Sequence, residues 1–155
     1  MESFLKRKFK KLKAVKTVSV RETKNLAFVF AEILRPGDVV ALTGDLGAGK
    51  THFVKGAAKF FGISGKQIVS PTFSLVKSHK GRGVEVFHFD FYRLKGIEEL
   101  EKTGYRDFLL EADSIVFVEW PEIVRETWDD FTHAVKIEHT GGNSRAITIY
   151  GKSGK

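Results

Sequence analysis

The glycine-rich segment GDLGAGKT at residues 44–51 constrains the fold of this chain more than any other feature, because it matches the pattern GxxxxGK[ST] in full. Its glycines let the backbone curl so that successive N–H groups converge on phosphate oxygens, which side chains would otherwise block. An apolar run at residues 39–42 comes directly before the segment, and a helical pattern at residues 50–61 follows it. A strand, a phosphate loop and a helix in this order predict a P-loop nucleotide-binding domain.

The loop supplies the candidate phosphate contacts. The ε-ammonium of Lys50 can reach the β- and γ-phosphates, and the Thr51 hydroxyl can ligate Mg²⁺. The helix that follows adds unpaired N–H groups and the positive end of its dipole. The expected nucleotide-binding residues of the loop are Asp45, Leu46, Gly47, Ala48, Gly49, Lys50 and Thr51.

Two carboxylates are candidates for the acid that a P-loop protein needs near its Mg²⁺. Glu119 ends the apolar run at residues 115–118, and Asp90 lies in the segment HFDFY at residues 88–92. An ionised carboxylate at the end of an apolar strand is costly unless something compensates its charge, and a metal ion would. The residues alone leave the choice between the two acids open.

Other polar and aromatic residues give weaker signals. The segment Ser70-Pro71-Thr72 is a rigid turn that can bring a hydroxyl to a γ-phosphate, although turns often contain these residues. Trp120, beside Glu119, either packs in the core or borders the nucleotide. The five histidines show no pair at metal-ligand spacing, so we expect them to be structural.

The chain as a whole has the composition of one globular domain, with 155 residues, 42% of them hydrophobic, and no cysteine. The lack of cysteine excludes disulfides, thiol catalysis and Cys-ligated zinc. No stretch approaches the roughly 18 apolar residues of a membrane-spanning helix. We therefore expect a cytoplasmic protein without membrane attachment.

Hydrophobic periodicity predicts an α/β fold, namely a single P-loop NTPase-like domain with a mixed central sheet flanked by helices. The apolar runs at residues 39–42 and 114–119 are typical of strands that are buried on both faces. The remaining expected strands lie at residues 16–20, 73–79, 84–91, 134–139 and 146–150. The expected helices lie at residues 22–34, 50–61, 97–102 and 105–110, with another beginning near Pro121.

The basic character of the chain is concentrated at its start. Residues 1–16 hold seven lysines and arginines against Glu2 alone, which is +6 of the total charge of +7. We expect a basic N-terminal extension at residues 1–16 and a P-loop ATPase domain at residues 17–155. The extension is either a poorly ordered solvated tail or a short amphipathic helix that docks on RNA or an acidic partner, with lipid the weakest option.

Taken together and in order, these segments resemble the TsaE (YjeE) family, the ATPases of bacterial tRNA threonylcarbamoyladenosine biosynthesis. The resemblance covers about residues 17–150 and is far more specific than a P-loop alone. The matching segments are SVRET at residues 19–23, LTGDLGAGKT at 42–51, VSPTF at 69–73, HFDFYRL at 88–94 and VEWPE at 118–122.

The resemblance implies a role for several residues. It implies ATP binding by Lys50 and the loop amides, and Mg²⁺ ligation by Thr51 and Glu119. It implies that Asp90 positions or activates the attacking water and that Thr72 belongs to a switch-like segment near the γ-phosphate. Further nucleotide contacts are implied for Thr23, Trp120 and Arg145.

The resemblance also implies the partners and the reaction. Proteins of this family hydrolyse ATP poorly alone and act with a TsaD–TsaB complex, which modifies adenosine 37 of tRNAs reading ANN codons. The tRNA would be reached indirectly through this complex, while the basic residues 1–16 depart from the usual family start and leave a direct contact open.

Two other functions fit a P-loop. One is a non-catalytic adaptor, in which ATP binding orders Thr72 and its neighbours and turnover is incidental. The other is a small-molecule kinase, which would close an arginine-bearing lid over the phosphates. The arginines Arg82, Arg93, Arg106 and Arg125 are scattered, and no long insertion offers such a lid.

Overall fold

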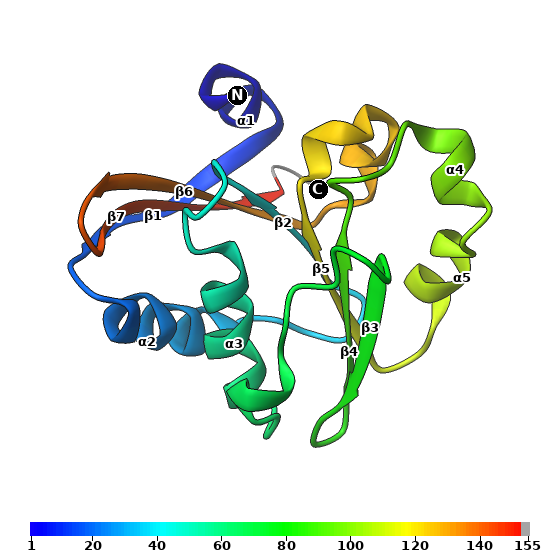
Figure 1. The fold of residues 1–155 in the computed structure, drawn as a ribbon, viewed down its shortest axis with the longest axis horizontal. Helices are drawn as coiled ribbons and strands as arrows, with labels where there is room; N and C mark the ends of the chain where they lie inside the picture. Colours follow the sequence, from blue (N-terminus) through cyan, green and yellow to red (C-terminus); the bar gives the residue numbers. More distant parts are fainter. Residues whose placement is uncertain (153–155) are drawn as a thin grey trace.

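The computed structural model of the chain describes residues 1–152, whose strands form one seven-stranded sheet (Figure 1). The strands are β1 (Phe9–Thr17), β2 (Val39–Thr43), β3 (Val76–Lys80), β4 (Glu85–Asp90), β5 (Ser114–Glu119), β6 (His133–Gly141) and β7 (Ser144–Lys152). Their order in space is β1-β7-β6-β2-β5-β4-β3. The four central strands run parallel, and β3, β7 and β1 are antiparallel to their neighbours. The prediction of an α/β domain with a mixed sheet is confirmed.

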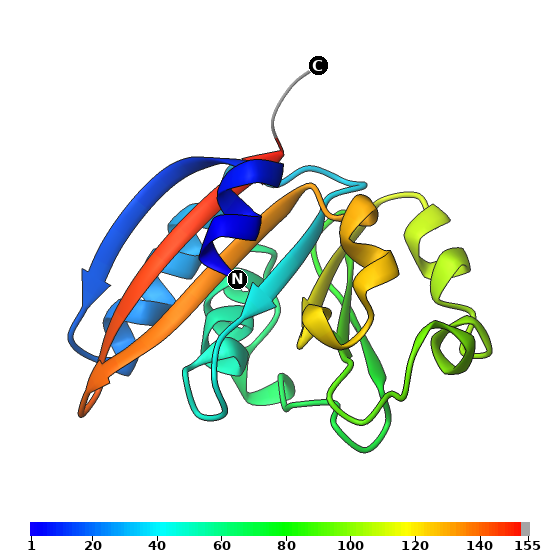
Figure 2. The same cartoon turned by 90° about the horizontal axis from the view of Figure 1, so that it is seen from above.

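Helices cover both faces of the sheet, so the central strands can be apolar throughout (Figures 1 and 2). The helices are α1 (Glu2–Lys8), α2 (Val20–Ala31), α3 (Lys50–Phe60), α4 (Ile97–Glu101) and α5 (Tyr105–Leu110), with 3₁₀ turns η1 (Gly65–Gln67), η2 (Pro121–Ile123) and η3 (Arg125–Asp130). Every residue of β2 and β5 is buried. Within residues 1–152, no helix is both long and apolar enough to cross a membrane.

The two cores lie on opposite faces of β2, because successive side chains of a strand point to opposite sides. Val40 and Leu42 pack in the core beneath α2 and α3. Val39 and Ala41 pack in the other core, to which α1, α4, α5 and η3 contribute. The strand that leads into the phosphate loop is therefore fixed from both sides.

Helix α2 begins two residues earlier than its hydrophobic pattern predicted, because a local hydrogen-bond pair fixes its start. The Ser19 hydroxyl accepts a hydrogen bond from the Glu22 N–H at 3.1 Å, and the Glu22 carboxylate accepts one from the Val18 N–H at 2.9 Å. This reciprocal arrangement is close to a capping box. The strand expected at residues 16–20 therefore ends at Thr17.

Helices α2 and α3 pack unusually closely at Gly56. A Cβ atom on Gly56 would lie 2.2 Å from the carbonyl oxygen of Lys24 on α2, so the approach of the two helices requires a glycine. Because α3 begins at the phosphate loop, this contact also ties the loop to α2.

The N-terminal residues pack on the sheet, and strand β1 crosses the boundary expected after residue 16. Strand β1 pairs with β7 from Phe9 to Thr17, and Leu5 and Phe9 are buried to within 2% (Figure 2). The lysines of β1 lie on an edge strand, where their charge disfavours pairing with the strands of other molecules. In the sequence alone, such a run of lysines looks like a solvated tail. Residues 153–155, assigned above to the domain, lie outside the described residues.

Two leucines of the N-terminal segment test this packing. Leu5→Ala should lower the free energy of unfolding by about 2–5 kcal/mol, because it removes a fully buried side chain and leaves a cavity. Leu12→Ala, at a side chain that is 48% exposed, should cost less than about 1 kcal/mol. Urea denaturation of both variants measures the difference. Equal, small losses would show that α1 does not pack on the domain.

Candidate nucleotide site

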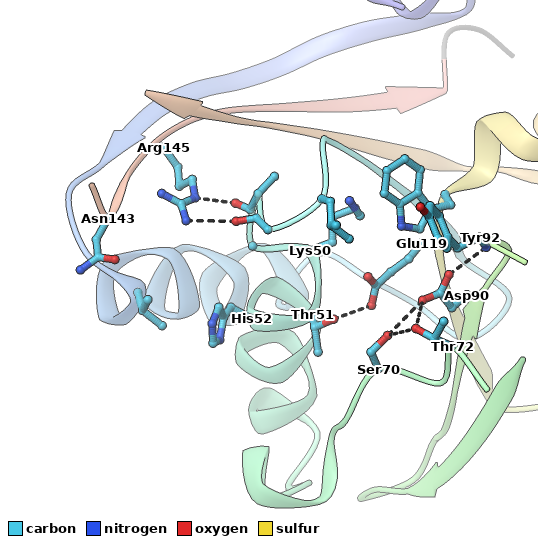
Figure 3. A pocket seen from close by; sticks show the side chains of 16 residues that line it. Lys50, Thr51, His52, Ser70, Thr72, Asp90, Tyr92, Glu119, Asn143 and Arg145 are labelled. Carbon is cyan, nitrogen blue, oxygen red and sulfur yellow. Dashed lines mark hydrogen bonds between the residues drawn. The ribbon is translucent and has the colours of Figure 1, made fainter. Parts of the chain in front are cut away.

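A cleft of about 440 Å³ lies where the carboxyl ends of β2, β5 and β4 meet the phosphate loop (Figure 3). The parallel register places Asp90 at the end of β4 beside Glu119 at the end of β5. Ligands of parallel α/β sheets bind at this edge. The cleft is lined by Val20, Leu46, Gly47, Ala48, Gly49, Lys50, Thr51, His52, Ser70, Thr72, Asp90, Tyr92, Glu119, Trp120, Asn143 and Arg145.

The phosphate loop presents unpaired backbone N–H groups at the start of α3. Only the N–H of Ala48 is used within the loop, donating to the Asp45 carbonyl at 2.9 Å. Among residues 1–152, none accepts a hydrogen bond from the N–H groups of Gly47, Gly49, Lys50 or Thr51. Gly49 precedes α3 with φ 111°, which a side chain would strain. Free N–H groups at a helix start form an anion-binding site.

Arg145 holds this loop from the other side. Its Nε donates to the Ala48 carbonyl at 2.5 Å, and one terminal nitrogen donates to the Gly47 carbonyl at 3.3 Å. The carbonyl and the following N–H of a planar trans peptide point in opposite directions, so these contacts turn the Gly49 N–H away from Arg145. The guanidinium of Arg145 thus acts on the loop backbone and also lines the cleft.

Lys50 is almost fully buried in the loop, with 5% of its surface exposed. Its ammonium donates to the Gly44 carbonyl and, at 3.1 Å, to the Asp45 carbonyl, and lies 4.0 Å above the Trp120 ring. Burial lowers the pKa of Lys50, while Glu119 and other acids act in the opposite direction. An anion in the cleft offers this ammonium a stronger partner than two neutral carbonyls do.

Glu119 joins the loop helix to the sheet. One of its carboxylate oxygens accepts a hydrogen bond from the Thr51 hydroxyl at 2.9 Å and lies 2.6 Å from His88 Nε2. Glu119 is 3% exposed and His88 is fully buried, and His88 Nδ1 has no partner among residues 1–152. The neutral tautomer with its proton on Nε2 fits both facts, because it buries neither a charge nor an unpaired N–H.

The Thr51 hydroxyl and the Glu119 carboxylate are suited to Mg²⁺ with a bound nucleotide. Within residues 1–152, no group of three or more His, Asp or Glu side chains could hold a metal ion. Mg²⁺ is usually held by one or two carboxylates together with waters and substrate phosphates, so a full protein cage is not needed. The donor set fits a nucleotide-bound Mg²⁺ and does not fit zinc.

Asp90 is fixed by three hydrogen bonds at the end of β4. One carboxylate oxygen accepts from the Ser70 and Thr72 hydroxyls at 3.0 and 2.9 Å, and the other accepts from the Tyr92 N–H at 2.9 Å (Figure 3). The second oxygen keeps a free lone pair for a further donor such as water. The predicted residues Asp90 and Thr72 are therefore in direct contact.

Trp120 lines the cleft and also packs against the core to which α1, α4, α5 and η3 contribute, so it lies at the boundary between the two. Its backbone has φ 59°, a left-handed conformation that is unfavourable for a bulky residue. The ring lies 4.9 Å from that of Tyr92 and beneath the Lys50 ammonium. This conformation turns the chain sharply after Glu119 and directs the indole over the loop.

Two predicted residues do not line the main cleft. Thr23 is 2% exposed, and its hydroxyl pairs with that of Thr17 at 2.8 Å, beside a small cavity next to Gly49 and Arg145. Asp45 contributes its carbonyl oxygen to Lys50 and to the loop turn.

The sequence reasoning missed several residues of the site. The sequence predicts only a structural role for His88, although its position two residues before Asp90 in a strand places both on one face. His52 and Asn143 lie at the end of the cleft near Arg145 (Figure 3), and Val20 also lines the cleft. The adjacency of His52 to Thr51 was a usable signal. Desolvation lowers the pKa of His52, and the nearby cations Lys24, Lys55 and Arg145 lower it further.

The sheet order, the loop and the helix that follows it define a P-loop NTPase-like α/β domain. The family model for "Threonylcarbamoyl adenosine biosynthesis protein TsaE" matches residues 17–147, and the chain belongs to this family.

Individual relatives agree with the family model. The tRNA threonylcarbamoyladenosine biosynthesis protein TsaE of Rickettsia conorii is 37% identical, over 84% of this chain and 74% of that protein. The protein of the same name from Bacillus subtilis is 35% identical, over 86% of this chain and 82% of that protein. The crystal structure of Bacillus subtilis YdiB superposes with a TM-score of 0.71 at 30% identity, covering 94% of this chain and 88% of that one.

The contact between His88 and Glu119 can be tested without any ligand. His88→Leu should lower the free energy of unfolding by about 1–3 kcal/mol at neutral pH, because the buried Glu119 carboxyl group loses one of its two partners. His79→Leu is the matched control, since His79 is half-buried and its Nε2 has no partner among residues 1–152; its effect should stay below about 1 kcal/mol. Equal losses in urea denaturation would contradict the assigned contact.

Proposed function

We propose that this chain binds Mg-ATP and hydrolyses it in support of N6-threonylcarbamoyladenosine formation at adenosine 37 of tRNAs reading ANN codons. The observation that carries the proposal is the hydrogen bond from Thr51 to Glu119, at the start of a helix whose loop presents unpaired N–H groups. Family membership supplies the tRNA modification. We further propose that the chain acts in the cytoplasm with TsaD- and TsaB-like proteins and reaches tRNA through them.

The binding step follows from the loop. The N–H groups of Gly47, Gly49, Lys50 and Thr51 would donate to phosphate oxygens. The Lys50 ammonium would exchange the Gly44 and Asp45 carbonyls for the β- and γ-phosphates. Mg²⁺, held by Thr51 and Glu119, would neutralise charge on the phosphates.

The hydrolytic step would use Asp90. Its free lone pair can accept a hydrogen bond from a water and orient that water toward the γ-phosphate, while Ser70, Thr72 and Tyr92 keep the carboxylate in place. Catalysis of phosphoryl transfer is mainly positioning and charge stabilisation, which this rigid cluster supports. Because the Thr72 hydroxyl donates a hydrogen bond to Asp90, movement of residues 70–73 would directly change how the Asp90 carboxylate is held.

A nucleotide-gated adaptor is the competing function. Phe73, directly after Thr72, is 86% exposed, with the Arg93 guanidinium 4.2 Å from its ring. Thr72 would sense the γ-phosphate in this alternative, and the exposed Phe73 ring beside it is a suitable contact for a partner protein. In this alternative, ATP binding alone would set the position of Phe73 and hydrolysis would be incidental.

The structure adds no support for a small-molecule kinase. Arg106 pairs with Asp130 at 2.9 Å, and Arg82 donates to the Phe60 carbonyl at 3.2 Å. Neither of these arginines lines the nucleotide cleft.

Phosphate release from Mg-ATP tests the proposed function. A TsaD–TsaB complex with tRNA should stimulate release by the wild-type chain, and Glu119→Ala should reduce the stimulated rate at least about 100-fold by removing the metal ligand. Glu32→Ala, at an exposed position on the end of α2, should leave the rate unchanged. A wild-type rate that the complex does not alter would refute partner-activated hydrolysis.

A second pair of variants separates the ATPase from the adaptor. Asp90→Asn should keep Mg-ATP binding while losing hydrolysis, because the amide can occupy the carboxylate's place but orients water poorly. Lys50→Ala should lose Mg-ATP binding. Titration calorimetry and a t6A formation assay under multiple turnover give the readouts. Full t6A formation with Asp90→Asn would establish the adaptor instead.

A further inference from the structure

A second cleft, of about 530 Å³, lies between α2 and α3 and is strongly basic. Four of its eight lining residues are cations, and none is acidic. The lining residues are Val20, Arg21, Lys24, Asn25, Lys55, Gly56, Lys59 and Gly65. A concave surface with four positive charges and no carboxylate repels itself unless an anion occupies it.

The four cations of this cleft are unpaired, as Arg7 and the lysines of β1 also are within residues 1–152. Within residues 1–152, Arg21, Lys24, Lys55 and Lys59 form no ion pair and no side-chain hydrogen bond. By contrast, acids already neutralise part of the charge on α1. Lys6 pairs with Glu2 at 2.7 Å, and Lys8 pairs with Asp129 at 2.5 Å. The cleft differs from β1 in that its four cations line one concave surface, whereas the lysines of β1 lie along an exposed edge strand.

The helix packing forces two of the cations into partly buried positions. Lys24 and Lys55 are half-buried, whereas Arg21 and Lys59 are exposed. Lys24 is also the residue whose carbonyl oxygen would lie 2.2 Å from a Cβ on Gly56. Half-buried lysines lose hydration, which makes an unpaired arrangement more costly than on an open surface.

The charges are spread along both helices. Arg21 and Lys24 lie about one turn apart on α2, as do Lys55 and Lys59 on α3, and one turn rises about 5.4 Å. This spread fits successive phosphates of a chain better than a single phosphate. Val20 lines both this cleft and the nucleotide cleft, so a bound chain would lie directly beside the nucleotide.

We propose that the α2–α3 cleft is a phosphate-binding site for an RNA backbone, and that its ligand is tRNA. Lysine and arginine contacts to phosphates provide most of the affinity and position the RNA without reading its bases. The choice of tRNA rests on the proposed function in tRNA modification. The assignment of a phosphate-binding site to this cleft rests only on its charges and on the packing of α2 against α3.

The test measures binding of labelled, unmodified tRNA to the full chain by fluorescence anisotropy over a series of salt concentrations. Lys24→Gln/Lys55→Gln should weaken binding about tenfold and reduce the slope of log K against log salt by about 1.4 to 1.8, which corresponds to two lost phosphate contacts. The variant should melt no lower than the wild type, because it removes two charges that repel their neighbours, and it should still bind Mg-ATP.

Two matched double variants carry the same change in charge. Lys95→Gln/Lys102→Gln, at exposed positions before and after α4, should alter tRNA affinity less than about twofold. Lys10→Gln/Lys13→Gln, on β1, tests the alternative that residues 1–16 contact tRNA. The proposal is wrong if the cleft variant binds like the α4 control, or if the β1 variant loses more affinity than the cleft variant.

Competition identifies the ligand and separates this proposal from the proposed function. Polyglutamate or short polyphosphate that displaces tRNA at an equal concentration of charge would overturn the assignment to RNA in favour of an acidic protein or a free polyphosphate. Absence of tRNA binding by the wild-type chain would also overturn it. Phosphate release with the TsaD–TsaB complex is measured on the same proteins. Failure of the proposed tRNA site and failure of the proposed ATPase activity therefore give different results.

Discussion

The buried carboxylate of Glu119 is the constraint on which the site depends. It ends a strand with no exposed position, where an uncompensated charge would cost several kcal/mol. The Thr51 hydroxyl and the His88 ring compensate it from α3 and from β4 respectively. These two contacts fix the start of the loop helix against the sheet. The Glu119 carboxylate, which a nearby positive charge would stabilise, is thus held at the edge of the sheet where the loop presents its N–H groups.

Several parts of the site could be predicted from sequence because they are local. The loop, its strand and its helix are contiguous, and glycines at fixed spacing specify the backbone. The apolar runs predict Asp90 and Glu119 at or near the ends of strands, and the parallel register then brings them together. The fold class followed from the same apolar runs.

Other parts depend on contacts between segments that are distant in the sequence. The role of His88 requires knowing that Glu119 lies beside it, 31 residues away. The N-terminal lysines suggest a tail because a concentration of exposed charge at a terminus is typical of a solvated segment, and only the pairing with β7 shows that they belong to a strand. The charge distribution along the sequence does not reveal the α2–α3 cleft, because its cations come from two separate helices.

The N-terminal strand also reaches the phosphate loop through its last residue. Thr17, at the end of β1, stands opposite Arg145 in the register with β7, and its hydroxyl pairs with Thr23 on α2. Arg145 in turn holds the Ala48 carbonyl. Strand β1 therefore supports β7, which carries Arg145. Through Thr17 it also connects β7 to α2, the helix beside the second cleft. Strand β1, most of which lies in the segment predicted to be an extension, thus contributes through its last residue to the geometry of the candidate nucleotide site.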